Sequence, residues 1–124
     1  MLTADMLTAL VSANVGTIGT TLFEGLAPDT AATAVVLNQY PGDPPLRSGS
    51  IIRPSVQAVI RAEKYADAEA LATATMDALD AIAETTLNGT RYLQVDARSS
   101  PGYMGQDAKQ RHQFVVNFNT IRER

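Results

Sequence analysis

The chain has 124 residues, of which 45% are hydrophobic, and this size and composition fit one globular domain, residues 1–124, with a modest core. It contains no cysteine, which excludes a disulfide framework and a thiolate metal site, and it shows neither a signal-peptide pattern nor an apolar run near the ~20 residues that span a bilayer. The formal net charge of −3, from 10 basic and 13 acidic residues, argues against a dedicated nucleic-acid-binding protein, because such a protein needs a concentrated basic face.

The first third of the chain predicts one helix and two strands. Thr3–Asn14 places its apolar residues on one helical face, with Thr3 or Asp5 as the residue that caps the helix start. Thr20–Leu26 contains the β-branched and aromatic residues of a short strand. Ala34–Tyr40 alternates as a second strand, which we expect to pair with the first.

The segment Pro41–Pro54 predicts a long surface loop. It holds four of the six prolines in the chain and two glycines, and a regular ladder does not run through such a sequence. Its apolar residues, Leu46, Ile51 and Ile52, need cover, either from a neighbouring subunit or from their own core. Ser55–Ala62 then alternates as a third strand.

A long alanine-rich helix is the centre of the predicted domain. It is expected over residues 65–86, and its apolar stripe recurs every three or four residues: Leu71, Thr75, Leu79, Ile82 and Thr86. Asn88 and Gly89 tolerate the left-handed conformation that closes a helix, and Tyr92–Arg98 follows as a strand.

The end of the chain predicts a second long loop and a last strand. Residues 99–111 contain glycine and proline, and His112–Ile121 alternates as a strand that pairs with Tyr92–Arg98. The fold class expected from these elements is α+β, a mainly antiparallel sheet of four to five strands with two helices packed on one face.

Residue patterns that carry catalysis are missing from the sequence. His112 is the single histidine, and it has no nearby acid to orient it. Asp77 and Asp80 share a helix face, but such pairs are far more often solvated than catalytic. No phosphate-binding glycine motif is present. We therefore expect no enzymatic activity, no metal and no cofactor, and a soluble protein without a membrane partner.

Five segments, in this order and spacing, carry a resemblance to a known family that covers nearly the whole chain. They are GTIGTTLFEGLAP (16–28), AVVLNQYPGDPP (34–45), RPSVQAVIRAEKYADAEALA (53–72), LNGTRYLQVDARSSPGYMGQD (87–107) and FVVNFNTIRER (114–124). The chain resembles the small minor capsid, or tail completion and tail terminator, proteins of long-tailed bacteriophages.

The resemblance implies a structural protein of the virion tail or neck, assembled in the host cytoplasm. Family members form a ring, typically six-fold, that caps the tail tube and meets the head-side connector, and they carry no catalytic residues. DNA is then expected to pass through the bore without sequence-specific binding. A head completion or neck protein, a tail tube protein, and a non-viral protein-binding module that uses residues 41–54 remain alternatives.

A ring needs a heterologous interface, in which one patch of a subunit meets a different patch of the next subunit. Sheet edges supply unpaired backbone groups for such a contact, and Thr20–Leu26 is the expected edge strand. The two long loops supply apolar and charged side chains. The candidate subunit-interface residues are Arg47, Ile51, Ile52, Arg53, Arg98, Tyr103 and Met104.

Overall fold

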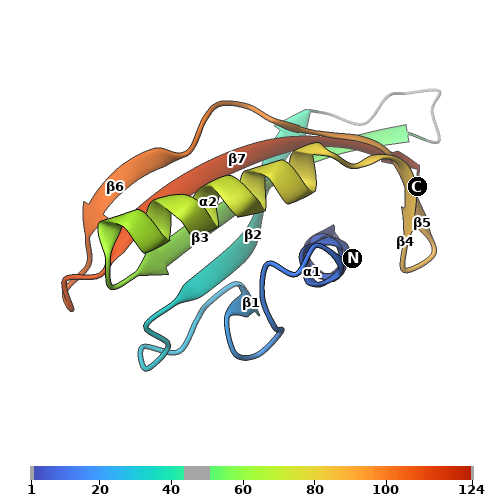
Figure 1. The fold of residues 1–124 in the computed structure, drawn as a ribbon. Helices are drawn as coiled ribbons and strands as arrows, with labels where there is room; N and C mark the ends of the chain where they lie inside the picture. Colours follow the sequence, from blue (N-terminus) through green and yellow to red (C-terminus); the bar gives the residue numbers. More distant parts are fainter. Residues whose placement is uncertain (1, 44–50, 124) are drawn as a thin grey trace.

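The computed structural model describes residues 2–43 and 51–123, which form two helices and seven strands (Figure 1). In chain order these elements are α1 (Leu2–Ser12), β1 (Leu22–Glu24), β2 (Ala34–Asp43), β3 (Ile51–Ala62), α2 (Tyr65–Asp80), β4 (Ala83–Leu87), β5 (Thr90–Ala97), β6 (Gly102–Gln106) and β7 (His112–Glu123).

All seven strands join one curled sheet in the order β1-β2-β3-β7-β5-β4. The pairing is antiparallel throughout except between β1 and β2, which run parallel. β7 is the central strand, because it pairs with β3 along one edge and with two strands along the other. On that other edge the first residues of β7 pair with β6 and its last residues pair with β5. The expected pairings of the first two strands with each other, and of the last strand with β5, are therefore confirmed.

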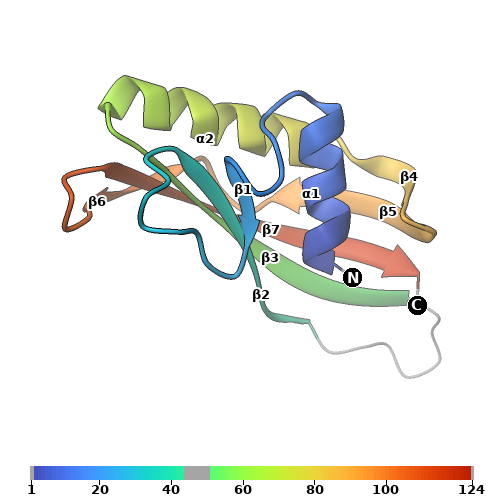
Figure 2. The ribbon, with the colours of Figure 1, turned by 90° about the horizontal axis from the view of Figure 1, so that it is seen from below.

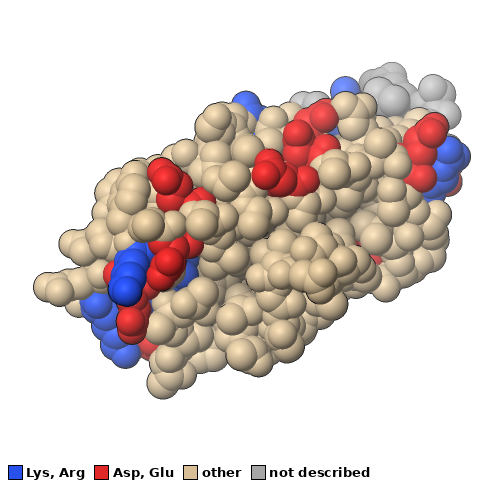
Figure 3. Space-filling view, in the orientation of Figure 1, with Lys and Arg blue, Asp and Glu red and all other residues tan. Residues whose placement is uncertain are grey.

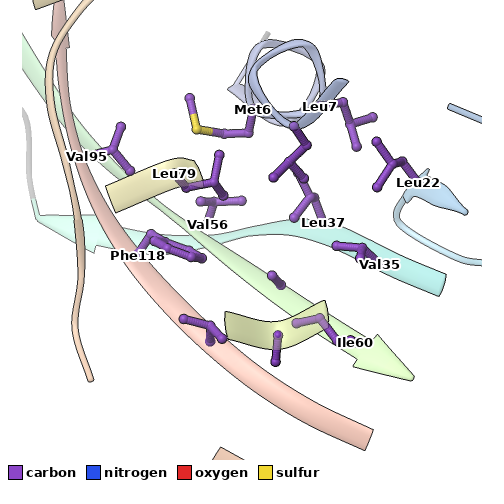
Figure 4. Packing of buried hydrophobic residues seen from close by; sticks show 14 of the residues in the cluster. Met6, Leu7, Leu22, Val35, Leu37, Val56, Ile60, Leu79, Val95 and Phe118 are labelled. Carbon is purple, nitrogen blue, oxygen red and sulfur yellow. The ribbon is translucent and has the colours of Figure 1, made fainter. Parts of the chain in front are cut away.

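Both helices lie on one face of the sheet, as predicted (Figures 1 and 2). α2 lies over β3, β7 and β5, and α1 packs against β1, β2 and the side of α2. An apolar core lies between the two helices and the sheet, and both helices and most strands contribute to it (Figure 4). The residues of this core include Met6, Leu7, Leu22, Val35, Leu37, Val56, Ile60, Leu79, Val95 and Phe118. α1 begins at Leu2, so Thr3 and Asp5 lie inside the helix rather than at its cap.

The predicted sheet of four to five strands is too small, because two strands occupy residues that the sequence assigns to a helix and to a loop. α2 ends at Asp80 rather than at Thr86, and β4 takes up the last residues of the expected helix. The N–H of Val95 donates to the carbonyl of Ile82, which joins this segment to β5. Asn88 and Gly89, with φ of 50° and 83°, form the turn of the β4–β5 hairpin instead of a helix stop.

Strands also extend into both predicted loops. β2 continues to Asp43 after a β-bulge, and β3 already begins at Ile51, so only part of the range 41–54 lies outside the strands that the structure describes. Pro54 is tolerated in β3 because it lies where both ladders are interrupted, opposite the β2 bulge and between the Ile52 and Ser55 pairs with β7, so that its missing N–H removes no ladder hydrogen bond. In the second loop, residues 102–106 form β6 by pairing with the first half of β7.

Candidate assembly surface

The β1 edge of the sheet is closed by its own chain. The N–H of Leu22 donates to the carbonyl of Thr17 over 3.0 Å, and the carbonyl of Leu22 accepts from the N–H of Gly19 over 2.9 Å. The carbonyl of Glu24 accepts from the N–H of Leu26 over 2.7 Å. The prediction that this strand offers free backbone groups to a neighbour is therefore wrong for Leu22 and for the Glu24 carbonyl, since local turns already use them.

What the β1 edge presents instead is apolar side chains. Leu26, two residues after β1, is 83% exposed, and Ile18, which forms a bridge with Leu22, is 55% exposed. We call Ile18 and Leu26 the β1 patch. Sequence reasoning did not identify either residue as a contact site, although a leucine between Gly25 and the Ala27–Pro28 pair is a large apolar residue in a turn, and that signal was available.

The β6 edge differs from the β1 edge. β6 pairs with β7 on one side, and no strand in the described part of the chain pairs with its other side. Its Tyr103 and Met104, at a β-bulge, are 47% and 54% exposed, and Tyr65 at the start of α2 is 45% exposed. We call Tyr65, Tyr103 and Met104 the aromatic patch.

Ring contacts hold the aromatic patch in place. The centroids of Tyr65 and Tyr103 lie 5.1 Å apart, and each ring lies 5.3 Å from Phe114 beneath them. The Tyr103 hydroxyl lies 2.8 Å from Nδ1 of His112. These tilted and edge-to-face contacts stabilise aromatic side chains in one arrangement, so the patch is formed before any binding.

The structure divides the predicted interface residues between the two ends of β7. Ile51 and Ile52 are half-buried in β3, where they pair with Glu123 and Arg122, and Arg53 lies opposite Asp43. Tyr103 and Met104 lie at the other end of β7, beside Phe114 and Gln113. Arg98 stands between the two groups, and its Nη1 donates to Tyr40 Oη over 3.1 Å. Leu46 and Arg47 lie outside the described residues.

The charged residues near the β6–β7 turn are used for internal pairing. Arg111 is 6% exposed, and its guanidinium donates to the Asp107 carboxylate, to the Asp29 carboxylate and to the backbone carbonyls of Asp29 and Ala31. The hydrogen bond from Lys109 lowers the pKa of Asp29, and the backbone N–H of Arg111 lowers the pKa of Asp107. These groups fasten the β1–β2 connection to the β6–β7 turn.

The charged side chains and two hollows of the described residues can be characterised by what lines them. On the face of the molecule that Figure 3 shows, acidic and basic side chains lie side by side at both ends, and there is no broad basic patch. One hollow is lined by the paired charges around Arg111, and another, between the ends of α1 and α2, is lined by four alanines with Ser12, Ile82, Thr85 and Leu87. No group of His, Asp or Glu side chains in residues 2–43 and 51–123 has the arrangement that holds a metal ion. Over the same ranges neither helix is both long and apolar enough to cross a membrane.

Comparisons with known proteins agree with a structural role. A family model described as bacteriophage tail terminator protein matches residues 9–124. A chain from a structure titled "Virion of native gene transfer agent (GTA) particle" has the same fold, with a TM-score of 0.72 at 18% sequence identity, over 99% of this chain and 95% of that chain. No curated protein matches the sequence.

Proposed function

Because this chain belongs to the bacteriophage tail terminator protein family and is a structural protein of the phage tail or neck, we propose that it forms a ring that caps the tail tube. The ring has six copies and joins the tube to the head-side connector. The observation that carries this proposal is the family match, which extends over residues 9–124 and so includes all seven strands of the sheet.

Two features of the structure support assembly rather than catalysis. The sheet presents apolar side chains at two different edges, on the β1 patch and on the aromatic patch. A surface of this kind suits protein–protein contact, because exposed apolar groups that cluster are stabilised when a partner covers them. The charged side chains around Arg111 are already paired within the subunit and hold its loops.

DNA passes through the bore of this ring without being held there. The chain carries a net charge of −3, and its Lys and Arg residues are interspersed with Asp and Glu (Figure 3). Tight binding to the DNA backbone requires many phosphate contacts from basic residues and weakens steeply with salt. A mildly acidic lining lacks that affinity, which suits a passage through which DNA must move in both packaging and ejection.

Electron micrographs of particles made without this protein test the proposal. Separate full heads, and tails of uncontrolled length, are the expected result, because nothing then ends the growth of the tube or offers a surface to the connector. Tails of normal length with unjoined heads would instead assign the chain to the head completion or neck proteins. Particles that lack tail tubes altogether would identify it as a tail tube protein, and normal particles would contradict a role in tail assembly.

A further inference from the structure

The large apolar side chains that the described residues expose are not spread evenly over the surface. Val11 stands alone on α1, whereas Ile18 and Leu26 form the β1 patch, and Tyr65, Tyr103 and Met104 form the aromatic patch. A single exposed leucine is ordinary in a folded protein. Two groups of exposed apolar side chains, at two sheet edges, indicate two contact surfaces.

The two patches lie on opposite sides of the β2–β3–β7 strands. The sheet begins at β1, and β6 is attached to the far edge of β7, so the patches belong to opposite edges of one sheet (Figures 1 and 2). A contact between these two different surfaces is heterologous, and it leaves one patch free on each end copy. Repetition of that contact produces a ring when the rotation between copies closes.

The chemistry of the patches is complementary. Leu26 is a strongly exposed aliphatic side chain on a turn, and the aromatic patch offers two exposed rings in contact with each other and the exposed, flexible thioether of Met104, which follows Tyr103 at the bulge. Buried aromatic and methionine side chains are common anchors of protein interfaces, and methionine adapts to the shape of the group that it meets. Because ring contacts with Phe114 and His112 already order Tyr65 and Tyr103, little side-chain entropy is lost when they bind.

One acid–base pair next to the patches is complementary, while exposed Glu63 and Asp67 also flank Tyr65 in the sequence. Glu24 is exposed two residues before Leu26, and Lys64 is exposed immediately before Tyr65. Neither side chain has an ion-pair partner within the described residues. Opposite charges at the rims of two contacting surfaces favour the correct pairing and its rate more than its strength.

We propose that the β1 patch of one copy docks on the aromatic patch of the next copy, with Leu26 between Tyr65 and Met104 and with Glu24 facing Lys64. The occupant of each patch is thus a second copy of this chain. This inference rests on the proposed ring and specifies its subunit contact.

Two complementary variants test the contact. Leu26→Asp removes the β1 patch and leaves the aromatic patch, and Met104→Asp does the reverse. Each variant alone is expected to stay monomeric in analytical ultracentrifugation. This result is expected both without tail tubes and after purified tail tubes are added. An equal mixture of the two is expected to form one-to-one dimers and nothing larger, because one intact pair of surfaces remains. Val11→Asp, an exposed apolar residue outside both patches, is the matched control and is expected to assemble as the unaltered chain does.

The absence of cysteine from the chain allows a second test by cross-linking. A Leu26→Cys, Met104→Cys double variant is expected to give a ladder of disulfide-linked oligomers that ends at the ring size under mild oxidation. Each single-cysteine variant is expected to give no ladder. Efficient dimer formation by a single variant would show that like patches meet, which would overturn the proposal.

The failure of this inference is distinguishable from the failure of the proposed ring. If the unaltered chain forms rings, and Leu26→Asp and Met104→Asp still form them, the ring stands and this contact is wrong. If the mixed variants stay monomeric while each is folded by circular dichroism, the contact is also wrong. If the unaltered chain forms no ring even on purified tail tubes, the proposed function itself fails, and this contact fails with it.

Discussion

The hydroxyl of Tyr92 donates a hydrogen bond of 2.5 Å to Oδ2 of Asp5, and both side chains are fully buried. The other carboxylate oxygen, Oδ1, accepts from Nδ2 of Asn88 over 2.9 Å. These bonds join α1 to β5 and to the turn of the β4–β5 hairpin. They explain how an acidic residue is accommodated on the buried face of α1, since a buried carboxylate is tolerated when hydrogen-bond donors satisfy it.

Removal of the Tyr92 hydroxyl is expected to destabilise the fold. Tyr92→Phe keeps the ring but removes a buried hydrogen bond to the Asp5 carboxylate, which costs about 1–3 kcal/mol. The measurement is the free energy of unfolding in urea. Tyr40→Phe is the matched control, because the Tyr40 hydroxyl meets Arg98 in an exposed hydrogen bond, and a change below about 1 kcal/mol is expected there. Equal losses for both variants would contradict a special role for the buried bond.

The same residue predicts a loss of stability in alkaline solution. Burial, and then the hydrogen bond and negative charge of Asp5, raise the pKa of Tyr92 above its ordinary value of 10.0. The stabilising contribution is therefore fully present below pH 10.0, where Tyr92 is protonated in both states. It is lost as the pH rises from there through the folded pKa, because the unfolded chain releases the proton first. Urea unfolding at a series of alkaline pH values should show a steeper loss for the unaltered chain than for Tyr92→Phe, and parallel curves would contradict this.

Arg111 is expected to be the strongest single link between the β1–β2 connection and the β6–β7 turn. Arg111→Ala removes the buried donor to the Asp29 carbonyl and to the Asp107 carboxylate, while the Ala31 carbonyl keeps its hydrogen bonds from Arg61. The variant is expected to lower the free energy of unfolding by about 2–4 kcal/mol. Lys109→Ala removes only an exposed ion pair to Asp29 and is expected to cost less than about 1 kcal/mol. Thermal unfolding followed by circular dichroism measures both. A milder effect at Arg111 than at Lys109 would contradict the assignment.

Ile51 and Ile52 are predicted to contact a neighbouring subunit from the start of β3. Replacement of both by Asp is expected to leave a folded monomer by circular dichroism while light scattering shows no rings, because their half-buried side chains retain surface for a partner. Replacement of both by Val keeps the apolar surface and is the control. Loss of folding in the Asp variant would instead show that these residues belong to the core of their own subunit.

Helices and strands whose sequence patterns are local could be predicted from the sequence, whereas those that depend on pairing with other strands could not. The first residue of α2, Tyr65, and the alternation of β7 follow from local periodicity and agree with the structure. The end of α2 does not, because Ala81 and Ala83 continue an alanine-rich pattern and only the pairing of β4 with β5 makes the segment a strand. Residues 102–106 carry two glycines and no strand signature, and they pair because β7 offers them an open edge.

The residues of the β1 patch and the aromatic patch also divide into those that the sequence indicates and those whose exposure only the tertiary fold reveals. Tyr103 and Met104 were identified because a loop with large apolar residues is conspicuous in a sequence. Leu26 and Tyr65 were not, because the exposure of a side chain depends on which elements cover it, and that is fixed by the tertiary fold. The closed β1 edge was missed for a different reason, since the hydrogen bonds of Leu22 come from a local turn with Thr17 and Gly19 that has no regular sequence pattern.

The most direct test of the central claim is the mass and position of the protein on purified tail tubes, measured by native mass spectrometry and electron cryo-microscopy. A single closed oligomer, with six copies, at one end of each tube is the predicted result. A monomer that never binds the tube, or open filaments of varied length, would contradict the assignment of this chain as the ring that ends the tail.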